Sequence, residues 1–181
     1  MVSPESIIEY WYSDKIKSHW FNSTELLDQE IKNKYEPLWR EAIRGDYKKW
    51  NESAEGCLAL AIIFDQFPLN MFRGKVKSFS TEGMAIKVTK HAIDNGFDQI
   101  IAKDKVVFLY MPLMHSENID DQNLAVAMFE KAGLEENLKF AKHHRTIVER
   151  FGRFPHRNKI LNRKNSEEEL EYLSSDEAFK G

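Results

Sequence analysis

The sequence has little cysteine, no long apolar run and no secretion signal, and each absence excludes a class of protein. It holds one cysteine, Cys57, in 181 residues, so an internal disulfide framework is excluded. Because Cys57 lies in the most apolar stretch of the chain, we expect a small core residue rather than a reactive thiol. No apolar run reaches the roughly 18 residues of a membrane span. The start, Met-Val-Ser-Pro-Glu, lacks the basic and apolar regions of a signal peptide, which predicts a cytoplasmic protein.

What the chain does contain is typical of one globular domain. Hydrophobic residues make up 42% of the sequence, with 12 Phe, 6 Tyr and 4 Trp, which excludes a disordered chain. A length of 181 residues is enough to bury a sizeable core. We therefore expect a single domain over residues 1–181, ending in a short acidic helix or tail at about 166–181.

Charge is unevenly distributed along the chain, although its net value is only −3. The segment Lys139–Lys164 carries nine lysine and arginine residues and one acid, Glu149, whereas residues 165–181 carry a net charge of −5. This pattern predicts either an anion-binding surface or internal pairing of the acidic tail with the basic segment. The pI near 6.1 and the adjacent acidic tail argue against binding of nucleic acid.

Helix start and stop signals recur throughout, and strand alternation is hard to find. Helices are expected at about 4–12, 24–44, 53–67, 81–95, 103–115, 120–131 and 135–151, with a short acidic helix from 166. Pro37 should kink or split its helix near Glu36, and Pro112 should kink its own. Pro68 should end its helix, because the residue before a proline avoids the helical region. The sequence therefore predicts an all-α fold of about seven helices in antiparallel hairpins.

Asp65 and Gln66 form the first group of polar residues at a position where burial of a polar group is unfavourable. Asp65 shares a helical face with apolar residues and lies in the last turn, where the helix dipole disfavours a negative charge. A carboxylate placed there needs a cation or hydrogen-bond donors, and Arg73 is the nearest candidate in the sequence. The favoured interpretation is a buried salt bridge that fixes the loop, and a ligand-facing or catalytic acid is the alternative.

The second group lies where one helix ends and the next begins, at His115, Glu117 and Asp121. Helix N-termini favour carboxylates, so Glu117 and Asp121 are candidates for capping. His115 follows apolar residues on its face, which favours a hydrogen-bonded core histidine over a ligand. The His-x-Glu pair is a weak metal signal, because residues two apart do not share a helix face.

The third group is the basic segment. On the helix expected at 135–151, His144 falls within the apolar face, Arg145 flanks that face, and His143 points away. Arg153, His156 and Arg157 follow Gly152 in a turn that also contains Phe154 and Pro155. Because these two apolar residues must pack, they should draw their charged neighbours toward the core. We expect a structural role for His144 and a functional one for the three turn residues.

Three long strings give the chain a resemblance to a known family. They are Leu-Ala-Ile-Ile-Phe-Asp-Gln-Phe-Pro-Leu-Asn-Met-Phe-Arg-Gly at 60–74, Phe-Leu-Tyr-Met-Pro-Leu-Met-His-Ser-Glu at 108–117 and His-His-Arg-Thr-Ile-Val-Glu-Arg-Phe-Gly-Arg-Phe-Pro-His-Arg-Asn at 143–158. The chain resembles the bacterial DUF924 family over nearly its whole length, with Leu69 where the family often has Arg and Glu82 where it often has Asp. The resemblance implies stacked helical hairpins in a tetratricopeptide-like right-handed array, and it implies no established activity.

Three functional hypotheses follow from these groups. The leading one is a pocket for a small anionic ligand, lined by Asp65, Gln66, Arg73, His115, Glu117, His144, Arg145, Arg153, His156 and Arg157. The second is a hydrolase-type enzyme in the same pocket, with candidate catalytic residues Asp65, His115, Glu117 and His144 and with Arg157 stabilising an oxyanion. Metal-assisted hydrolysis would draw three ligands from His115, Glu117, His144, Asp65 or Asp121. No cofactor is expected, since a Gly-rich phosphate loop and zinc spacing are both missing. The third hypothesis is a peptide- or protein-binding module built on a concave helical groove.

Overall fold

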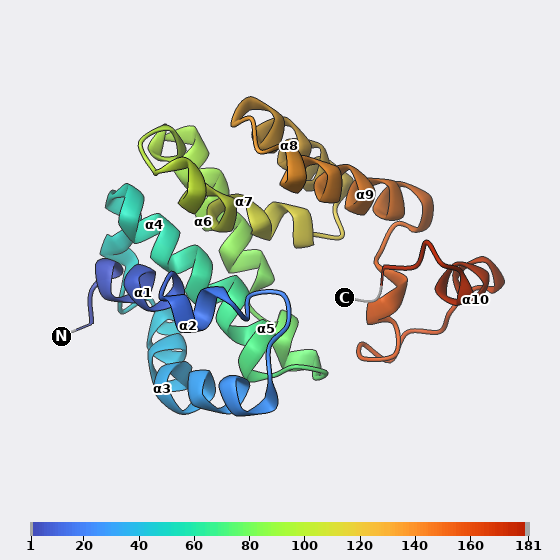
Figure 1. Cartoon of the computed structure of the whole chain (residues 1–181), viewed down its shortest axis with the longest axis horizontal. Coiled ribbons are helices and arrows are strands. Elements are labelled where there is room, and N and C mark those ends of the chain that lie inside the picture. Colours follow the sequence, from blue (N-terminus) through green and yellow to red (C-terminus); the bar gives the residue numbers. More distant parts are fainter. Residues whose placement is uncertain (1, 180–181) are drawn as a thin grey trace. The chain divides into compact units, whose positions relative to one another are not determined.

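The computed structural model describes residues 2–179, in which every regular element is helical and no β-strand occurs. This confirms the all-α class. The described residues group into two compact units, one of residues 2–73 and 77–112 and the other of residues 74–76 and 113–179 (Figure 1). The single domain expected from the sequence stays a prediction.

The helices begin and end close to the expected positions. The α-helices are α1 (Pro4–Trp11), α2 (Asp14–Lys17), α3 (Glu25–Arg44), α4 (Ala54–Ala61), α5 (Phe67–Met71), α6 (Glu82–Asp94), α7 (Lys103–His115), α8 (Ile119–Lys131), α9 (Glu135–Phe151) and α10 (Glu167–Ser174). Short 3₁₀ turns lie at η1 (Lys48–Glu52), η3 (Val76–Phe79), η4 (Phe97–Gln99) and η5 (Pro155–Arg157). The expected number of about seven was too low, in part because α2 carries too few residues for a periodic pattern.

Local caps explain why most boundaries were predictable. Ser3 and Ser166 each form a capping box, with Ser6 and Glu169 respectively, and Thr24 accepts a hydrogen bond from the backbone N–H of Leu27. Gly45 ends α3 in the left-handed conformation, at φ 87°. These signals lie within four residues of the helix end that they determine, so they can be read from sequence alone.

The first unit is built around α4, which is buried on every side as its apolar sequence predicts. It packs on α1, α6 and η1. Cys57 is fully buried there, and burial raises the pKa of its thiol to about 11. The expectation of a core cysteine is therefore confirmed.

Pro68 does not end this helix, and the expectation that it would was wrong. A π-helical turn, η2 (Ile62–Gln66), joins α4 to α5, and the N–H of Phe67 donates to the carbonyl of Ile62. Pro68 has no N–H for the carbonyl of Phe64, four residues earlier. The hydroxyl of Thr81 donates to that carbonyl instead, at 2.6 Å. A side chain from outside the helix thus satisfies the acceptor that the proline leaves open.

Replacing Thr81 with valine should lower the free energy of unfolding by about 1–3 kcal/mol. The change leaves the buried carbonyl of Phe64 without its donor, and it also removes the acceptor of the Trp39 indole N–H, which lies 3.2 Å from the hydroxyl. Urea denaturation measures the effect. Thr146→Val is the matched control, because Thr146 is exposed and bonds only within its own helix, so it should stay within about 0.5 kcal/mol of wild type. Equal effects at the two positions would contradict this account.

Pro37 and Pro112 do not split their helices. Both lie inside elements that continue past them, α3 to Arg44 and α7 to His115. Among residues 2–179, no helix is long and apolar enough to cross a membrane.

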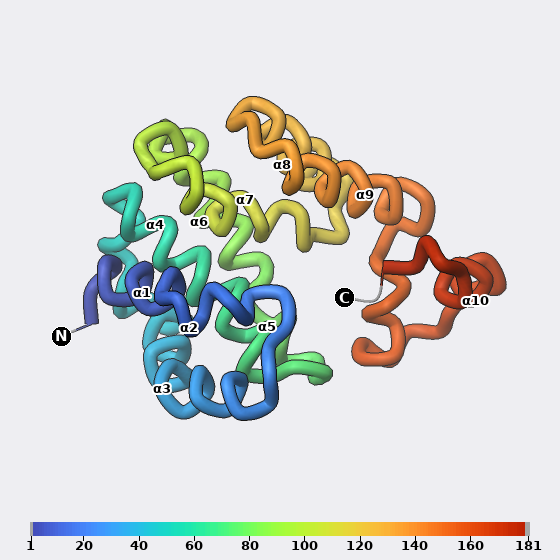
Figure 2. Tube along the Cα trace, viewed as in Figure 1, coloured from blue at the N-terminus to red at the C-terminus, as the bar shows by residue number. Residues whose placement is uncertain are grey.

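The second unit contains the helical hairpin of α8 and α9, joined through residues 132–134, and the two helices run along each other (Figure 2). A small core forms where α9, the turn after it and α10 meet, from Ile147, Val148, Phe154 and Tyr172. Phe154 and Pro155 are buried, as expected. Phe140 was also expected on the apolar face of the helix at 135–151, because it is apolar and precedes Ala141. This expectation was wrong, since Phe140 is 56% exposed.

Candidate functional site

Asp65 and Gln66 lie in the π-helical turn of the first unit and are buried, with 4% and 6% of their surface exposed. The side-chain amide of Gln66 donates to the carboxylate of Asp65. Arg73, the expected partner of Asp65, pairs instead with Asp28 of α3 at 2.6 Å, and its side chain is 56% exposed. Asp28 lies 45 residues before Arg73, so sequence proximity to Asp65 could not identify this pairing.

The structure places the other seven predicted site residues in the second unit. His115 and Glu117 come from the end of α7 and the loop after it, His144 and Arg145 from α9, and the remaining three are Arg153, His156 and Arg157, in or near η5. Their surroundings differ. Glu117 and Arg153 form ion pairs, Arg157 is buried against the ring of Phe154, and His144 and His156 pack in an aromatic cluster.

Glu117 links two distant segments rather than capping α8. Its carboxylate accepts two hydrogen bonds from the guanidinium of Arg163, at 2.6 and 2.8 Å, and one from the backbone N–H of Phe154, at 2.8 Å. Partial burial opposes ionisation, but these donors hold the pKa of Glu117 below its ordinary value. Asn118 caps α8 in its place, accepting from the backbone N–H of Asp120 and Asp121. Glu117 is therefore a carboxylate that already has three donors.

Arg157 is buried, with 6% of its surface exposed, which confirms that the packed turn draws its charges inward. Its guanidinium donates to the backbone carbonyl of His115 at 2.8 Å and lies 4.7 Å from the centre of the Phe154 ring. The side chain thus ties the end of α7 to the turn after α9.

Arg153 pairs with the acidic C-terminal helix. Its guanidinium donates to both carboxylate oxygens of Glu169, at 2.7 and 2.8 Å. Arg150 donates a single hydrogen bond to the carboxylate of Glu168, at 2.7 Å. The pairing with Arg153 lowers the pKa of Glu169 to about 2. A hollow of about 290 Å³ lies over these ion pairs, lined by Arg150, Phe151, Arg153, Ser166, Glu168 and Glu169. Internal pairing of the acidic tail with the basic segment, one of the two predicted explanations, is confirmed at these positions.

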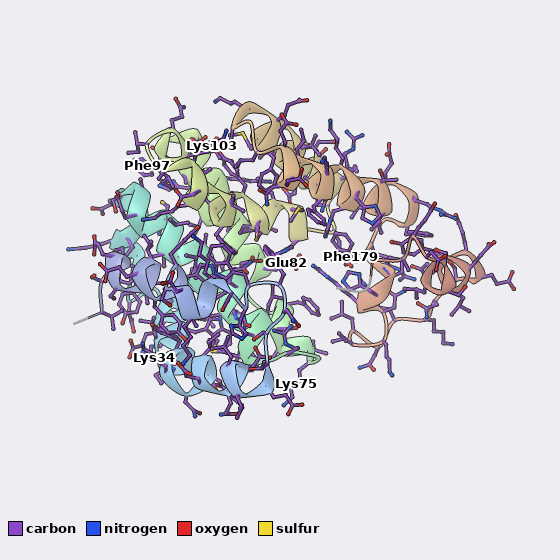
Figure 3. All side chains as sticks on the ribbon, in the orientation of Figure 1. Lys34, Lys75, Glu82, Phe97, Lys103 and Phe179 are labelled. Carbon is purple, nitrogen blue, oxygen red and sulfur yellow. The ribbon has the colours of Figure 1, made fainter. Side chains whose placement is uncertain are left out.

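Three imidazole rings surround the aromatic side chain of Phe179 in what we call the histidine cluster (His143, His144 and His156). The ring centre of Phe179 lies 4.4 Å from that of His144, 5.0 Å from that of His156 and 6.4 Å from that of His143. Phe179 is labelled in Figure 3. His143 is exposed, as expected, whereas His144 is 4% exposed and bonds through Nδ1 to the carbonyl of Phe140 at 2.8 Å. Because a carbonyl only accepts, Nδ1 carries the proton of the neutral ring.

Burial and like charges keep two rings of this cluster neutral. Burial lowers the pKa of His144 to about 3, and the neighbouring His115, His143 and His156 act in the same direction. Burial, followed by the charge of Arg157, lowers the pKa of His156 to about 4. At neutral pH these imidazoles therefore act as hydrogen-bonding aromatic rings rather than as cations.

These lowered pKa values predict that the protein loses stability as the pH falls from 7 to 5. Below the ordinary pKa of 6.5 the unfolded chain binds protons that the folded rings refuse until about pH 4, so each ring removes up to about 1.4 kcal/mol per pH unit in this window. Glu169 acts only at lower pH, since its carboxylate loses its contribution between 4.5 and about 2. Urea denaturation at several pH values measures the slope. Single His144→Gln and His156→Gln variants should each flatten it, and an unchanged slope in both would contradict the prediction.

Arg145 differs from every other arginine between 145 and 163. The other four donate to a carboxylate or carbonyl, as described for Arg150, Arg153 and Arg157 and for Arg163. Arg145 is half-buried at the edge of the packed face of α9, one turn from Ala141 and Val148. Its Nε atom is shielded from solvent and meets no hydrogen-bond partner within residues 2–179. A guanidinium N–H in that state is costly unless an acceptor reaches it.

Three side chains that the sequence analysis did not select also form hydrogen bonds in the second unit. They are Arg163, Glu169 and Asn158. Glu169 had a signal, because it occupies the third position of a predicted capping box. Arg163 lay in a run of basic residues without periodicity, and nothing local marked it. No group of three histidine, cysteine or acidic side chains in the described chain is arranged to hold a metal ion, so metal-assisted hydrolysis gains no support.

Comparisons with known proteins identify a family and a solved structure that are both described as of unknown function. Residues 7–177 match a family described as bacterial protein of unknown function, DUF924. A solved structure of a protein of unknown function from Agrobacterium tumefaciens, ATU0120, is similar over 94% of this chain and 96% of its own. The two chains share 37% sequence identity and superpose with a TM-score of 0.89. No curated protein matches the sequence.

Proposed function

The chain belongs to the DUF924 family of bacterial proteins of unknown function, and from this premise we propose that it binds a small oxyanion through Arg145 in its second unit. The observation that carries the proposal is the half-buried guanidinium of Arg145, which, unlike the other four arginines between 145 and 163, donates to no acceptor in the described chain. An oxyanion supplies that acceptor and a compensating charge. A guanidinium group binds carboxylate and phosphate oxygens in the same two-point geometry, so both classes fit.

The electrostatics of the surrounding segment support the proposal. Residues 139–164 carry one acid among nine basic residues, and the acidic helix α10 pairs with Arg150 and Arg153 rather than with Arg145. The cation on α9 therefore keeps its attraction for an anion from solution. Arg153 and Glu117 were both predicted as ligand-binding residues. Because each already forms an ion pair within the chain, we do not include them among the proposed contacts to the anion. The residues of the first unit have no part in the proposal.

The acid–base enzyme remains the weaker alternative. A general base needs a free lone pair near neutral pH. The carboxylate oxygens of Glu117 already accept hydrogen bonds from Arg163 and from the backbone of Phe154. The lowered pKa of His144 makes that ring a poor base.

We also propose that the helical hairpins stack in a tetratricopeptide-like right-handed array. Such an array would form a groove for a protein or peptide. The α8–α9 hairpin supports it, because such arrays are built from antiparallel helix pairs with short turns. A crystal structure in which successive hairpins do not repeat a constant rotation would exclude it.

The anion site is tested by thermal unfolding with phosphate, sulfate or oxalate, at constant ionic strength set with chloride. At a concentration about a hundredfold above Kd, a bound anion stabilises by about 2.7 kcal/mol, which raises Tm by several degrees. Arg145→Gln should lose the shift. Arg150→Gln is the matched control, since it removes the same charge from an exposed position on the same helix. The proposal fails if no anion raises Tm, or if Arg145→Gln keeps the wild-type response.

A further inference from the structure

Phe179, after helix α10, lies in an aromatic pocket of the second unit. Phe179 lies against the rings of the histidine cluster, as described above, and Phe154 forms the floor, with its ring centre 5.5 Å from those of both His144 and His156. Most of these contacts are edge-to-face, the geometry that aromatic rings prefer. The pocket is therefore shaped for one planar aromatic side chain.

The occupant of this pocket is lightly held. Helix α10 ends at Ser174, and residues 175–179 form no helix. The backbone N–H of Phe179 donates to the hydroxyl of Tyr172 at 2.9 Å, and that of Ala178 to the carbonyl of Ser175 at 3.3 Å. Phe179 itself stays partly exposed. Ala178 and Phe179 pack at the edge of the small core. Partly exposed segments outside regular helices open at lower free energy than the core, so we expect this one to leave its pocket without unfolding the unit.

The lining of the pocket is unusual for a core. Imidazole rings lose hydration when they are buried, whereas leucine or valine would pack a phenylalanine without that cost. His144 and His156 nevertheless provide the two shortest ring-to-ring distances of Phe179. Polar rings at such a position are typical of a ligand site, where a few polar groups interrupt an apolar wall.

We propose that the histidine cluster is a binding site for a phenylalanine-bearing acidic segment of a partner protein, and that Phe179 occupies this site within the free chain. The chemistry of the partner follows from the present occupant. Asp176 and Glu177 precede Phe179 and are exposed, and they accompany it onto a unit whose residues 139–164 carry nine basic side chains. A partner segment with the same acidic and aromatic pattern would displace the tail and use the same charge complementarity.

The test uses the full-length chain and an amidated, fluorescein-labelled peptide, Ser-Ser-Asp-Glu-Ala-Phe, which copies residues 174–179. Phe179→Ala empties the pocket, so this variant should bind the peptide at least about tenfold more tightly than wild type, whose own tail competes. The same peptide with Ala in place of Phe should bind neither protein. Fluorescence anisotropy gives both affinities, and circular dichroism confirms that the variant is folded.

A second variant separates binding at the pocket from attraction to the basic surface. His156→Ala, added to Phe179→Ala, removes one wall and should weaken peptide binding, whereas Lys139→Ala, on an exposed position of α9, should change it little. Should Phe179→Ala prove unfolded, histidine ring resonances of the wild-type chain serve instead, and those of His144 and His156 should shift as the peptide displaces the tail. Equal binding of the Phe and Ala peptides, or no binding to the emptied pocket, would overturn the proposal.

Discussion

Replacing Gly56 with alanine is expected to lower the free energy of unfolding by about 4 kcal/mol or more, which leaves little of the marginal stability typical of a domain. Gly56 lies in α4, where that helix meets η1. A Cβ atom there would overlap the carbonyl oxygen of Trp50 and would lie 2.7 Å from its carbonyl carbon and 2.8 Å from its Cα. These are backbone atoms, so no rotation of a side chain relieves the overlap, and η1 must move away from the most buried helix of the unit.

Gly83→Ala is the matched control for this effect. Gly83 also lies in a helix, α6, but no atom lies within 4 Å of the position that its Cβ would take. Alanine there should raise the free energy of unfolding by up to about 1 kcal/mol, through helix propensity and a less flexible unfolded chain. Urea denaturation of the two variants therefore gives changes of opposite sign. Similar changes at the two positions would show that the close approach of η1 to Gly56 has no energetic weight.

Gly56 also illustrates which part of the fold the sequence could not predict. Capping residues such as Ser3, Thr24 and Ser166 act on backbone groups a few residues away, and the helices that they start were predicted correctly. The need for glycine at position 56 arises from a second segment, η1, and no local pattern reveals it. The prediction that the helix ends at Pro68 was wrong for the same reason. Its continuation depends on a π-helical turn and on the hydroxyl of Thr81, which lies 17 residues after the carbonyl of Phe64 that it bonds.

In the candidate site too, features set by local sequence were predicted, and features set by distant segments were not. The position of His144 on a packed face and of His143 in solvent followed from helical periodicity, and both were predicted correctly. Partners were predicted poorly, because an arginine side chain reaches whatever carboxylate the fold brings near it. Arg73 pairs with Asp28 rather than Asp65, and Glu117 pairs with Arg163, 46 residues later. Sequence therefore identified charged residues that needed partners, and only tertiary structure showed that Arg145, unlike Arg150 and Arg153, donates to no acceptor within the described chain.

Phe154→Ala is expected to lower the free energy of unfolding by about 3–5 kcal/mol. The side chain is fully buried between α9, η5 and α10, where it joins the small core of Ile147, Val148 and Tyr172. The guanidinium of Arg157 lies 4.7 Å from the centre of its ring, and the ring also contacts those of His144 and His156. Truncation removes apolar contacts and leaves a cavity beneath two imidazoles and a buried cation, so the loss should lie at the upper end of the range.

The control is Phe140→Ala, which makes the same truncation at a position that is 56% exposed and should change the free energy of unfolding by less than about 0.5 kcal/mol. Phe154→Leu should recover most of the loss, because it restores apolar volume, although it cannot restore the cation–π contact with Arg157. Urea denaturation of the three variants ranks these effects. If leucine restored full stability, the ring of Phe154 would serve only to fill space. A remaining deficit would measure what its aromatic character contributes to holding Arg157 and the histidine cluster in place.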